Sequence, residues 1–412
     1  MSSTRRLAIA VLVSLGLVAT ACSSSGSGGS PSGGTASSQG VGTTSGAAAE
    51  SGDIKVGIIC SCSGVYGAAF KAGQDAFEAW SNTINDAGGI NGHNIKLLKQ
   101  DDGLNPAKSA AAYKSLLSQK IVVLVDLTPL DATWISNVKT DDIPVLAGPT
   151  ATINPLVFWS GQSSGGAFTA DATIASLKLA GAKKFGMLNG TDSPQAIAGA
   201  KYTSAAAKKA GITIAYQTSI SNAQPNYTAE CIAAEQAGVD ALTIGEQPST
   251  IARAASDCDK QGFHPAYIGS LTSWSPANAE SPGLKDNSYL TSTNYPYFDD
   301  TQPQIKALNA AMDKYFSGVR TAATTPAEVV VGMWASGIML QKAIEAANVG
   351  TADVTSAKII QGLRSFKDET LDGLSPPLNF PAGGDNTIKC FFVARFNGKY
   401  SIENGGKYTC AA

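Results

Sequence analysis

The sequence predicts an α/β protein with two doubly wound parallel-sheet lobes. Three observations support this fold class. Short apolar runs rich in β-branched residues alternate with segments of helical periodicity along most of the chain. Such alternation is typical of repeated βα units, whose strands pair in parallel. The alternating part spans roughly 360 residues, a length that favours two lobes over one core.

The amino-terminal segment has the composition of an export signal followed by a tether. Two arginines precede an apolar run, residues 7–18, which is shorter than the ~20 residues that span a bilayer. Small residues then lead to Cys22 in a pattern that resembles the lipobox of bacterial lipoproteins. We expect residues 1–21 to be removed and Cys22 to be lipidated at the cell membrane; the alternative is an ordinary secretory signal. Residues 22–52, rich in Ser and Gly, are predicted to be a flexible tether.

The balance of charges argues against nucleic-acid binding. The chain has 30 Lys and Arg residues against 32 Asp and Glu residues, and it has no dense basic block that would neutralise phosphates. Its two histidines, His93 and His264, lack any accompanying spacing of metal ligands. We therefore expect no metal and no cofactor.

The first lobe opens with a βαβ unit on which the other elements build. The strand Ile54–Cys60 is followed by a loop of small residues, 61–67, and by a helix over 69–84. Glycines in 88–92 end that helix, and a second strand starts at 95–98. Ligands of open parallel sheets bind beyond the carboxyl ends of the strands. The 61–67 loop lies at such an end and offers hydroxyls and N–H groups but no catalytic base, so we expect it to hold a small polar group.

The remaining elements follow from the same alternation. The rest of the first lobe is predicted to contain strand 121–125, helix 131–140 and strand 143–147. The second set is predicted to be helix 167–180, strand 184–189, helix 195–210, strand 212–217, helix 228–237, strand 239–244, helix 250–261 and strand 266–269. Later elements are an extended segment 288–296, helices 304–317 and 327–348, and a hairpin of 388–395 with 400–402 around Asn397-Gly398.

Cysteine usage agrees with export. Six cysteines remain besides the lipidated one: Cys60, Cys62, Cys231, Cys258, Cys390 and Cys410. An even number outside the cytoplasm predicts disulfides. We expect the bridges Cys231–Cys258 and Cys390–Cys410, because each pair lies within one local substructure. For the first two cysteines the sequence leaves a bridge and two reduced thiols equally open.

A set of short motifs matches one known family. The most specific motif is Ala-Gly-Gly-Ile-Asn-Gly at 87–92. The others are 54–58 with Ser63-Gly64, Asp101-Asp102 with Asn105-Pro106, 143–145 and 182–186. With these motifs the chain resembles the type I periplasmic binding proteins of the branched-chain (hydrophobic) amino-acid ABC transporters, over essentially everything after Gly52.

The resemblance implies a fold and a role. Lobe 1 would comprise 53–163 and 290–380, and lobe 2 would comprise 164–289 and 381–412. A hinge of three crossovers would join them near 158–165, near 287–294 and shortly before 388. Such a protein has no catalytic activity; as a monomer, it closes on a solute and presents it to a membrane permease.

The resemblance also places the solute pocket. In the first lobe its contacts fall on Ser61, Cys62, Ser63, Thr128, Thr150 and Thr152. Hydroxyls and main-chain N–H groups in this pattern are typical of a site for a carboxylate or carbonyl oxygen. We call the hydroxyl-bearing members of this set the cradle.

The second lobe departs from the family's pattern. Gln247 and the Ser193-Pro194 step stand near the positions of two tyrosines, and Leu271 replaces the Glu that pairs with an amino acid's ammonium. Glu246 or Asp126 is a possible substitute for that carboxylate. A buried ammonium without a counter-charge is unfavourable. We therefore expect a small carboxylate, amide or other polar solute to bind better than leucine, isoleucine or valine.

Two other functions fit parts of the sequence. A tethered sensor that signals to a membrane partner would need the same closing pocket. A serine hydrolase would use Ser163, because Gly161–Gly165 matches G-x-S-x-G and His264 lies downstream. That frame recurs by chance in a chain with 43 Gly, and the family resemblance makes this segment a hinge.

Overall fold

A computed structural model describes residues 52–63, 67–149, 151–161, 166–191, 194–318, 327–350, 352–384, 386 and 388–410. All of them belong to one unit of the chain, Ala49–Ala412. The predicted signal peptide, Cys22 and all but the last residue of the predicted tether lie outside the described residues. Thr150 and Ser163 lie outside them as well.

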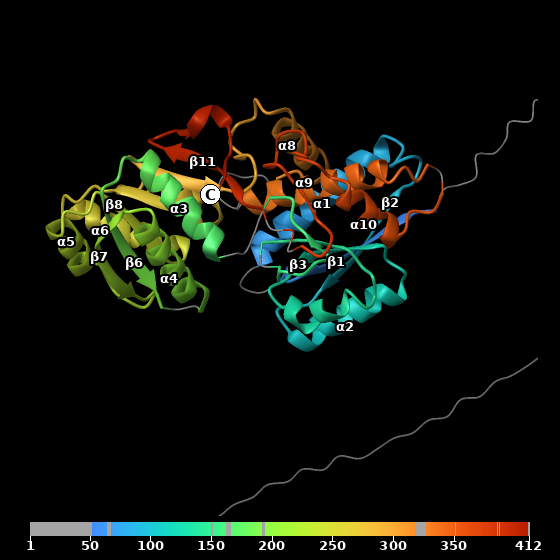
Figure 1. Ribbon diagram of the computed structural model, residues 1–412, viewed down its shortest axis with the longest axis horizontal. Coiled ribbons are helices and arrows are strands. Elements are labelled where there is room, and N and C mark those ends of the chain that lie inside the picture. Colours follow the sequence, from blue (N-terminus) through green and yellow to red (C-terminus); the bar gives the residue numbers. More distant parts are fainter. Residues whose placement is uncertain are drawn as a thin grey trace, which may run out of the picture. The chain divides into compact units, whose positions relative to one another are not determined.

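The first sheet is parallel and has the strand order β2-β1-β3-β4-β5. Its strands are β1 (Ile54–Cys60), β2 (Ile95–Asp101), β3 (Val123–Leu127), β4 (Val145–Leu146) and β5 (Val157–Phe158). Its helices are α1 (Gly67–Asp86), α2 (Pro106–Ser118), α8 (Pro303–Tyr315), α9 (Ala327–Ala346) and α10 (Ser356–Arg364). In Figure 1, α2 lies on one side of β1 and β3, whereas α1 and α9 lie on the other.

Close packing of α1 against α9 builds the core beneath this sheet. Phe77 and Trp80 of α1 are buried, and so is Met333 of α9. A Cβ atom on Gly337 would come within 2.2 Å of the Trp80 ring, so only glycine lets the two helices approach this closely. The apolar spacing that predicted α1 therefore reflects a helix buried against a second helix.

The second sheet has the order β12-β11-β10-β9-β8-β6-β7, and β13 also pairs with β11. Its strands are β6 (Lys184–Gly190), β7 (Thr213–Ile220), β8 (Ala241–Gly245), β9 (Ala266–Ser270), β10 (Ser288–Ser292), β11 (Cys390–Phe396), β12 (Tyr400–Ile402) and β13 (Thr409–Cys410). The strands from β7 to β10 pair in parallel, and β11 joins β10 antiparallel. The predicted α/β class with two parallel sheets is confirmed.

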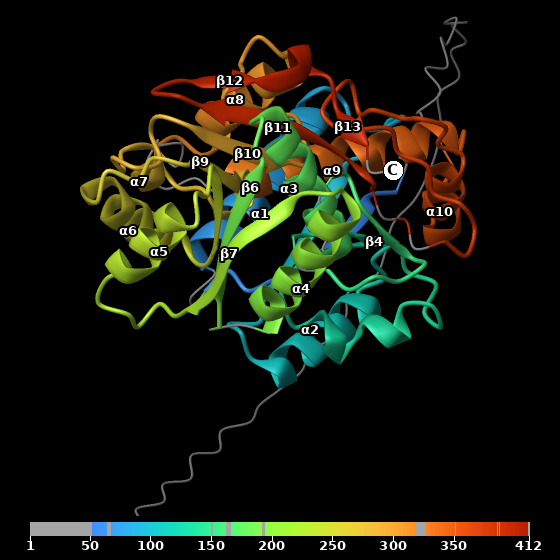
Figure 2. The same cartoon turned by 60° about the vertical axis from the view of Figure 1, so that its left-hand side comes forward.

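Helices cover both faces of the second sheet. They are α3 (Gly166–Leu179), α4 (Pro194–Lys209), α5 (Thr228–Gln236), α6 (Pro248–Lys260) and the short α7 (Pro276–Ala279). One apolar cluster joins α3 and α4 to Phe185 and Met187 of β6, and another joins α5 and α6 to Leu242 and Ile244 of β8. Figure 2 shows α3 and α4 together on one side of β6, with α5 and α6 apart from them.

The structure contains three disulfides among its described residues. The predicted bridges Cys231–Cys258 and Cys390–Cys410 are both present and confirmed. Cys60 and Cys62, which the sequence left open, also form a bridge. This third bridge spans the carboxyl end of β1 and the start of the predicted ligand loop.

The predicted helix over 131–140 is wrong. Two short 3-10 turns, Asp131–Thr133 and Ile135–Asn137, replace it, with Trp134 between them at φ −143°. Trp134 is buried, stacks on Tyr113 at 5.4 Å and donates a hydrogen bond to the Ser109 hydroxyl at 3.2 Å. These tertiary contacts fix Trp134 outside helical geometry.

Two helices are additional to the sequence analysis, and one predicted lobe boundary falls within a strand. The prediction omitted α2 and α10, although Asn105 and Pro106 give α2 a standard cap and first position. A boundary between residues 289 and 290 would divide β10, which pairs with β9 and β11 along Ser288–Ser292. The division of the chain into lobes stays a prediction.

The segments that connect the two sheets contact one another. The Asn294 amide, after β10, donates to the Ser160 carbonyl at 3.0 Å and to the Leu374 carbonyl at 3.4 Å. The Asn386 amide, before β11, donates to the carbonyls of Pro155 and Val157 at 2.9 Å each. All three connections thus lie side by side.

Candidate functional site

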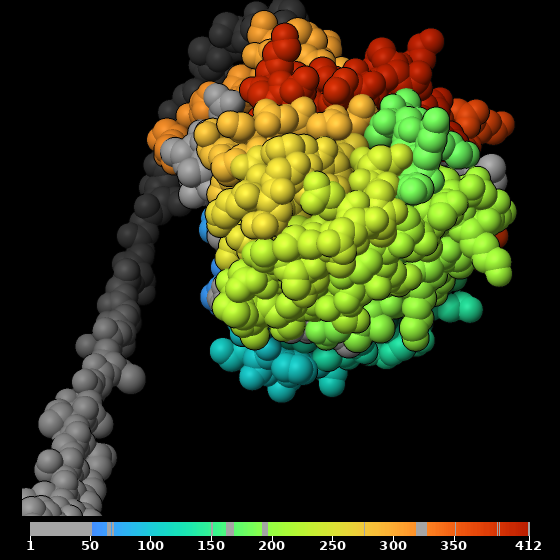
Figure 3. Space-filling view, turned by 90° about the vertical axis from the view of Figure 1, so that its left-hand side faces the viewer, coloured from blue at the N-terminus to red at the C-terminus, as the bar shows by residue number. Residues whose placement is uncertain are grey.

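A pocket of about 490 Å³ opens at the carboxyl ends of the parallel strands of the second sheet. Asn189 of β6, Gln247 after β8, Ser270 of β9 and Thr291 of β10 are among the residues that line it. Figure 3 shows the face of the molecule formed mostly by the green to yellow part of the chain, from α3 to α7, that surrounds these strands.

Local geometry explains how the pocket acquires its polar wall. The chain leaves β8 through Glu246 and Gln247, and Gln247 is extended because Pro248 at the first position of α6 disfavours helical backbone before it. Trp274 also lines the pocket, and its indole donates to the Tyr400 hydroxyl at 2.8 Å. Glu246 is the only carboxylate among the described lining residues, and these include no Lys or Arg.

The three predicted second-lobe residues separate into two groups. Glu246 and Gln247 both line the pocket. Leu271 does not; it is 2% exposed and belongs to the apolar cluster with Leu242 and Leu284. The roles of these residues in binding stay predictions.

In the first lobe, Ser61 and Thr128 meet over a carboxylate of the chain itself. The Ser61 hydroxyl donates to Asp102 Oδ1 at 2.7 Å, and the Thr128 hydroxyl donates to Asp102 Oδ2 at 2.6 Å. All three side chains are fully buried. The ends of β1, β2 and β3 thus form one closed hydrogen-bonded group.

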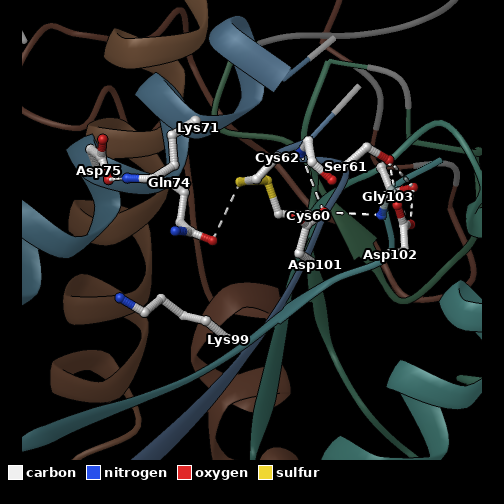
Figure 4. The surroundings of a disulfide bond; sticks show 12 residues. Cys60, Ser61, Cys62, Lys71, Gln74, Asp75, Lys99, Asp101, Asp102 and Gly103 are labelled. Atoms are coloured by element: carbon white, nitrogen blue, oxygen red, sulfur yellow. Dashed lines mark hydrogen bonds and ion pairs between the residues drawn. A yellow bond between two sulfur atoms is a disulfide. The ribbon is translucent and has the colours of Figure 1, made fainter. Parts of the chain in front are cut away.

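The neighbouring loop residues are also engaged. Ser63 donates through its backbone N–H, at 3.3 Å, and through its hydroxyl to Asp101, the last residue of β2. Burial opposes ionisation of Asp101, but hydrogen bonds from Gly103, Ser63 and Cys62 outweigh it and lower the pKa of this carboxyl. Figure 4 shows Gln74 of α1 facing the Cys62 sulfur, with Ser61 and Asp102 on the other side of the disulfide.

The last described cradle residue, Thr152, binds Asp131. Its backbone N–H donates to Asp131 Oδ2 at 2.5 Å and its hydroxyl donates to Asp131 Oδ1 at 2.9 Å. Burial raises the pKa of the Asp131 carboxyl, although these two bonds and the Ala132 N–H act in the opposite direction. Asp102 and Asp131 are functional candidates that the site prediction missed, because they lie 41 and 21 positions from the hydroxyls they accept from.

A third carboxyl lies deeper in the first lobe. Asp126 is 1% exposed; its Oδ1 accepts from the Thr128 N–H at 3.1 Å, while its Oδ2 has no hydrogen-bond partner among the described residues. Burial, followed by the nearby charges of Asp131 and Asp102, raises its pKa well above the usual value. The raised pKa favours the protonated, uncharged form of the Asp126 carboxyl.

Glu328, in the first turn of α9, is a further carboxyl that the prediction missed. It is 4% exposed and accepts hydrogen bonds from Thr272, from Ser292 at 3.3 Å, and from the N–H and hydroxyl of Thr293 at 2.9 and 3.1 Å. Burial raises the pKa of Glu328, while these bonds act against the rise. Glu328 therefore links a first-sheet helix to Thr272, which follows β9, and to Ser292 and Thr293 at the end of β10.

Neither a metal site nor a membrane span is found in the described part of the chain. Its His, Cys, Asp and Glu residues form no group of three or more that would suit a metal ion. No described helix is both long and apolar enough to cross a bilayer. His264, the histidine considered for a hydrolase, is exposed and lies 3.3 Å from Asp259 of α6.

Comparison with known proteins identifies similar folds. A family model described as periplasmic binding protein matches residues 53–405. A fatty acid ABC transporter substrate-binding protein from Thermomonospora curvata has a TM-score of 0.66 at 20% identity, covering 87% of this chain and 95% of that one. A branched-chain amino acid transporter substrate-binding protein from Streptococcus pneumoniae, solved with isoleucine, has a TM-score of 0.64 at 19% identity, covering 87% and 99%. No curated protein matches the chain.

Proposed function

The chain belongs to the periplasmic binding protein family, and we propose that it is the extracytoplasmic solute-binding component of an ABC transporter. It captures a small polar solute between its two lobes and delivers it to a membrane permease. The likeness to substrate-binding proteins for fatty acids and branched-chain amino acids supports this class of function. The protein acts as a monomer.

The observation that carries the proposal is the pocket at the carboxyl ends of β6, β8, β9 and β10. Its volume of about 490 Å³ is within the usual range for small-molecule sites. Hydroxyls and amides line it, and its described lining residues belong to the second sheet and to the helices and loops around that sheet. The three adjacent connections between the sheets are suited to a hinge that brings the two edges together on the solute.

Filling the pocket should weaken solute binding. A solute is first identified because it raises the melting temperature of the wild type. We expect Gln247→Trp to lower the affinity for that solute by at least about tenfold, because the indole would occupy the cavity. Gln217→Trp is the matched control, since Gln217 is equally exposed but lies on the edge strand β7, outside the pocket lining. Calorimetry gives both affinities. Equal affinities in the two variants would place the site elsewhere.

The protein is held at the membrane by a lipid on Cys22. Supporting this are the short apolar run before Cys22 and the Ser/Gly-rich segment after it. Mass spectrometry of the mature protein should find a diacylated Cys22 as its first residue, and Cys22→Ser should release the protein from membranes. A mature chain that begins at another residue would contradict the lipid anchor.

A further inference from the structure

The cradle hydroxyls already hold carboxylates that belong to the chain. Ser63 donates to Asp101, Ser61 and Thr128 donate to Asp102, and Thr152 donates to Asp131. Thr150, the remaining member, lies outside the described residues. Each described cradle residue, which was expected to bind a solute's carboxylate, thus donates to an Asp carboxylate of the chain itself.

The contact of Thr152 with Asp131 has the geometry of carboxylate recognition. One N–H and one hydroxyl of the same residue reach the two oxygens of one carboxylate, at 2.5 and 2.9 Å. A solute carboxylate at this position would have to displace Asp131, which is 2% exposed, and leave its charge buried without these donors. If it did not displace Asp131, it would lie beside a like charge.

The charged groups around the site also disfavour an anionic solute. The first-lobe edge carries the carboxyls of Asp101, Asp102 and Asp131, and the second-lobe pocket carries Glu246. No Lys or Arg is among the described residues that line the pocket. An anionic solute would find no Lys or Arg in the described pocket lining, whereas N–H and O–H donors would find the Glu246 carboxylate there.

We propose that the solute is uncharged or cationic and carries N–H or O–H donors, and that Asp131 takes the place of a ligand carboxylate at Thr152. This inference rests on the proposed solute-binding function and narrows it to amides, polyols and amines. Asp131 is then a specificity-determining residue, because it fills the carboxylate position and repels a second anion.

The test compares solutes that share a skeleton but differ in charge. One set is isovalerate, isovaleramide and isoamylamine; the other is succinate, succinamide, 1,4-diaminobutane and erythritol. Both are measured with a charge-sorted library of polar metabolites by thermal shift and then calorimetry. We expect the tightest binders to be neutral or cationic, with the matched acids at least about tenfold weaker. Tightest binding by an acid to the wild-type protein would overturn the inference and leave the proposed function intact. No binding by any compound would contradict both.

A variant tests the assigned role of Asp131. Asp131→Asn removes the charge at similar size, so it should raise the affinity for the acids by about tenfold or more and change that for the amides less than about threefold. Asp142→Asn is the control, because it makes the same charge change at an exposed turn residue whose positive φ Asn tolerates. An unchanged acid affinity in folded Asp131→Asn would overturn the assignment. If Asp131→Asn does not fold, the affinities of the wild-type protein for the matched acids, amides and amines still test the proposed solute class.

Discussion

Glu328→Ala is expected to lower the free energy of unfolding by about 2–4 kcal/mol, because it removes the common acceptor of several buried donors. Thr272, Ser292 and Thr293 all donate to this carboxylate. Each buried donor left without an acceptor costs about 1–3 kcal/mol, and rotation of the hydroxyls recovers part of the loss. Urea unfolding gives the change.

Glu328→Gln is the matched variant, because it keeps one acceptor oxygen and nearly the same volume. Its loss should be less than about half that of the alanine variant. If the free energies of unfolding of both variants lie within about 0.5 kcal/mol of the wild-type value, the hydrogen bonds to Glu328 contribute little to stability.

The difference in the free energy of unfolding between the wild type and Glu328→Gln should depend on pH. Because burial raises the pKa of Glu328, the folded state binds this proton more tightly than the unfolded chain does. The resulting stabilisation is present below the unfolded-state pKa and is lost as the pH rises through the folded-state pKa. The stability advantage of the wild type over Glu328→Gln should therefore fall as the pH rises above the unfolded-state pKa of about 4.3. A pH-independent difference would contradict the raised pKa.

Loss of the Cys231–Cys258 bridge is expected to be the second large effect. The two cysteines are 27 positions apart, and in the chain-entropy model a bridge of this span contributes about 3.5 kcal/mol. Both residues are fully buried between α5 and α6, so their local structure cannot fray independently. The double Cys231→Ala, Cys258→Ala variant should unfold at correspondingly lower urea, and dithiothreitol should lower the stability of the wild type to a similar degree.

The Cys390–Cys410 bridge provides the control. Its span of 20 positions predicts nearly the same entropic contribution, but Cys410 is exposed in the short strand β13. That strand can detach while the rest of the sheet stays folded, so removing this bridge should affect unfolding of the whole protein much less. Equal losses for the two double variants would show that loop length alone sets the contribution.

Much of the fold was predictable because its signals are local. The apolar periodicity of 69–84 and the β-branched run before it belong to α1 and β1, and the even cysteine count led to two correct bridges. The prediction failed where distant contacts decide the backbone. Trp134 leaves helical geometry because it packs on Tyr113 and bonds to Ser109, neither of which its own segment contains.

The site was harder to predict than the fold for the same physical reason. A hydroxyl in a loop at the end of a strand has the same sequence signal whether it faces a solute or a carboxylate of the chain. The partner of Ser61, Asp102, follows β2, and the partner of Thr152, Asp131, lies in the turn after β3; only the folded structure brings these groups together. The residues of the cradle could be listed from the sequence, but not the groups to which they bind.

The antiparallel strand β11 has a consequence for the order in which the protein folds. It pairs with β10 from Ser288↔Phe396 to Ser292↔Phe392. The two residues of the last pair are 100 positions apart in the sequence. During synthesis the parallel strands of the second sheet are therefore available long before their neighbour. Until residues 390–396 emerge, β10 is an open edge that can pair with another chain. Such non-local pairing is slow, so the last step of folding, closure of this edge, is also the one in which misassembly competes most directly.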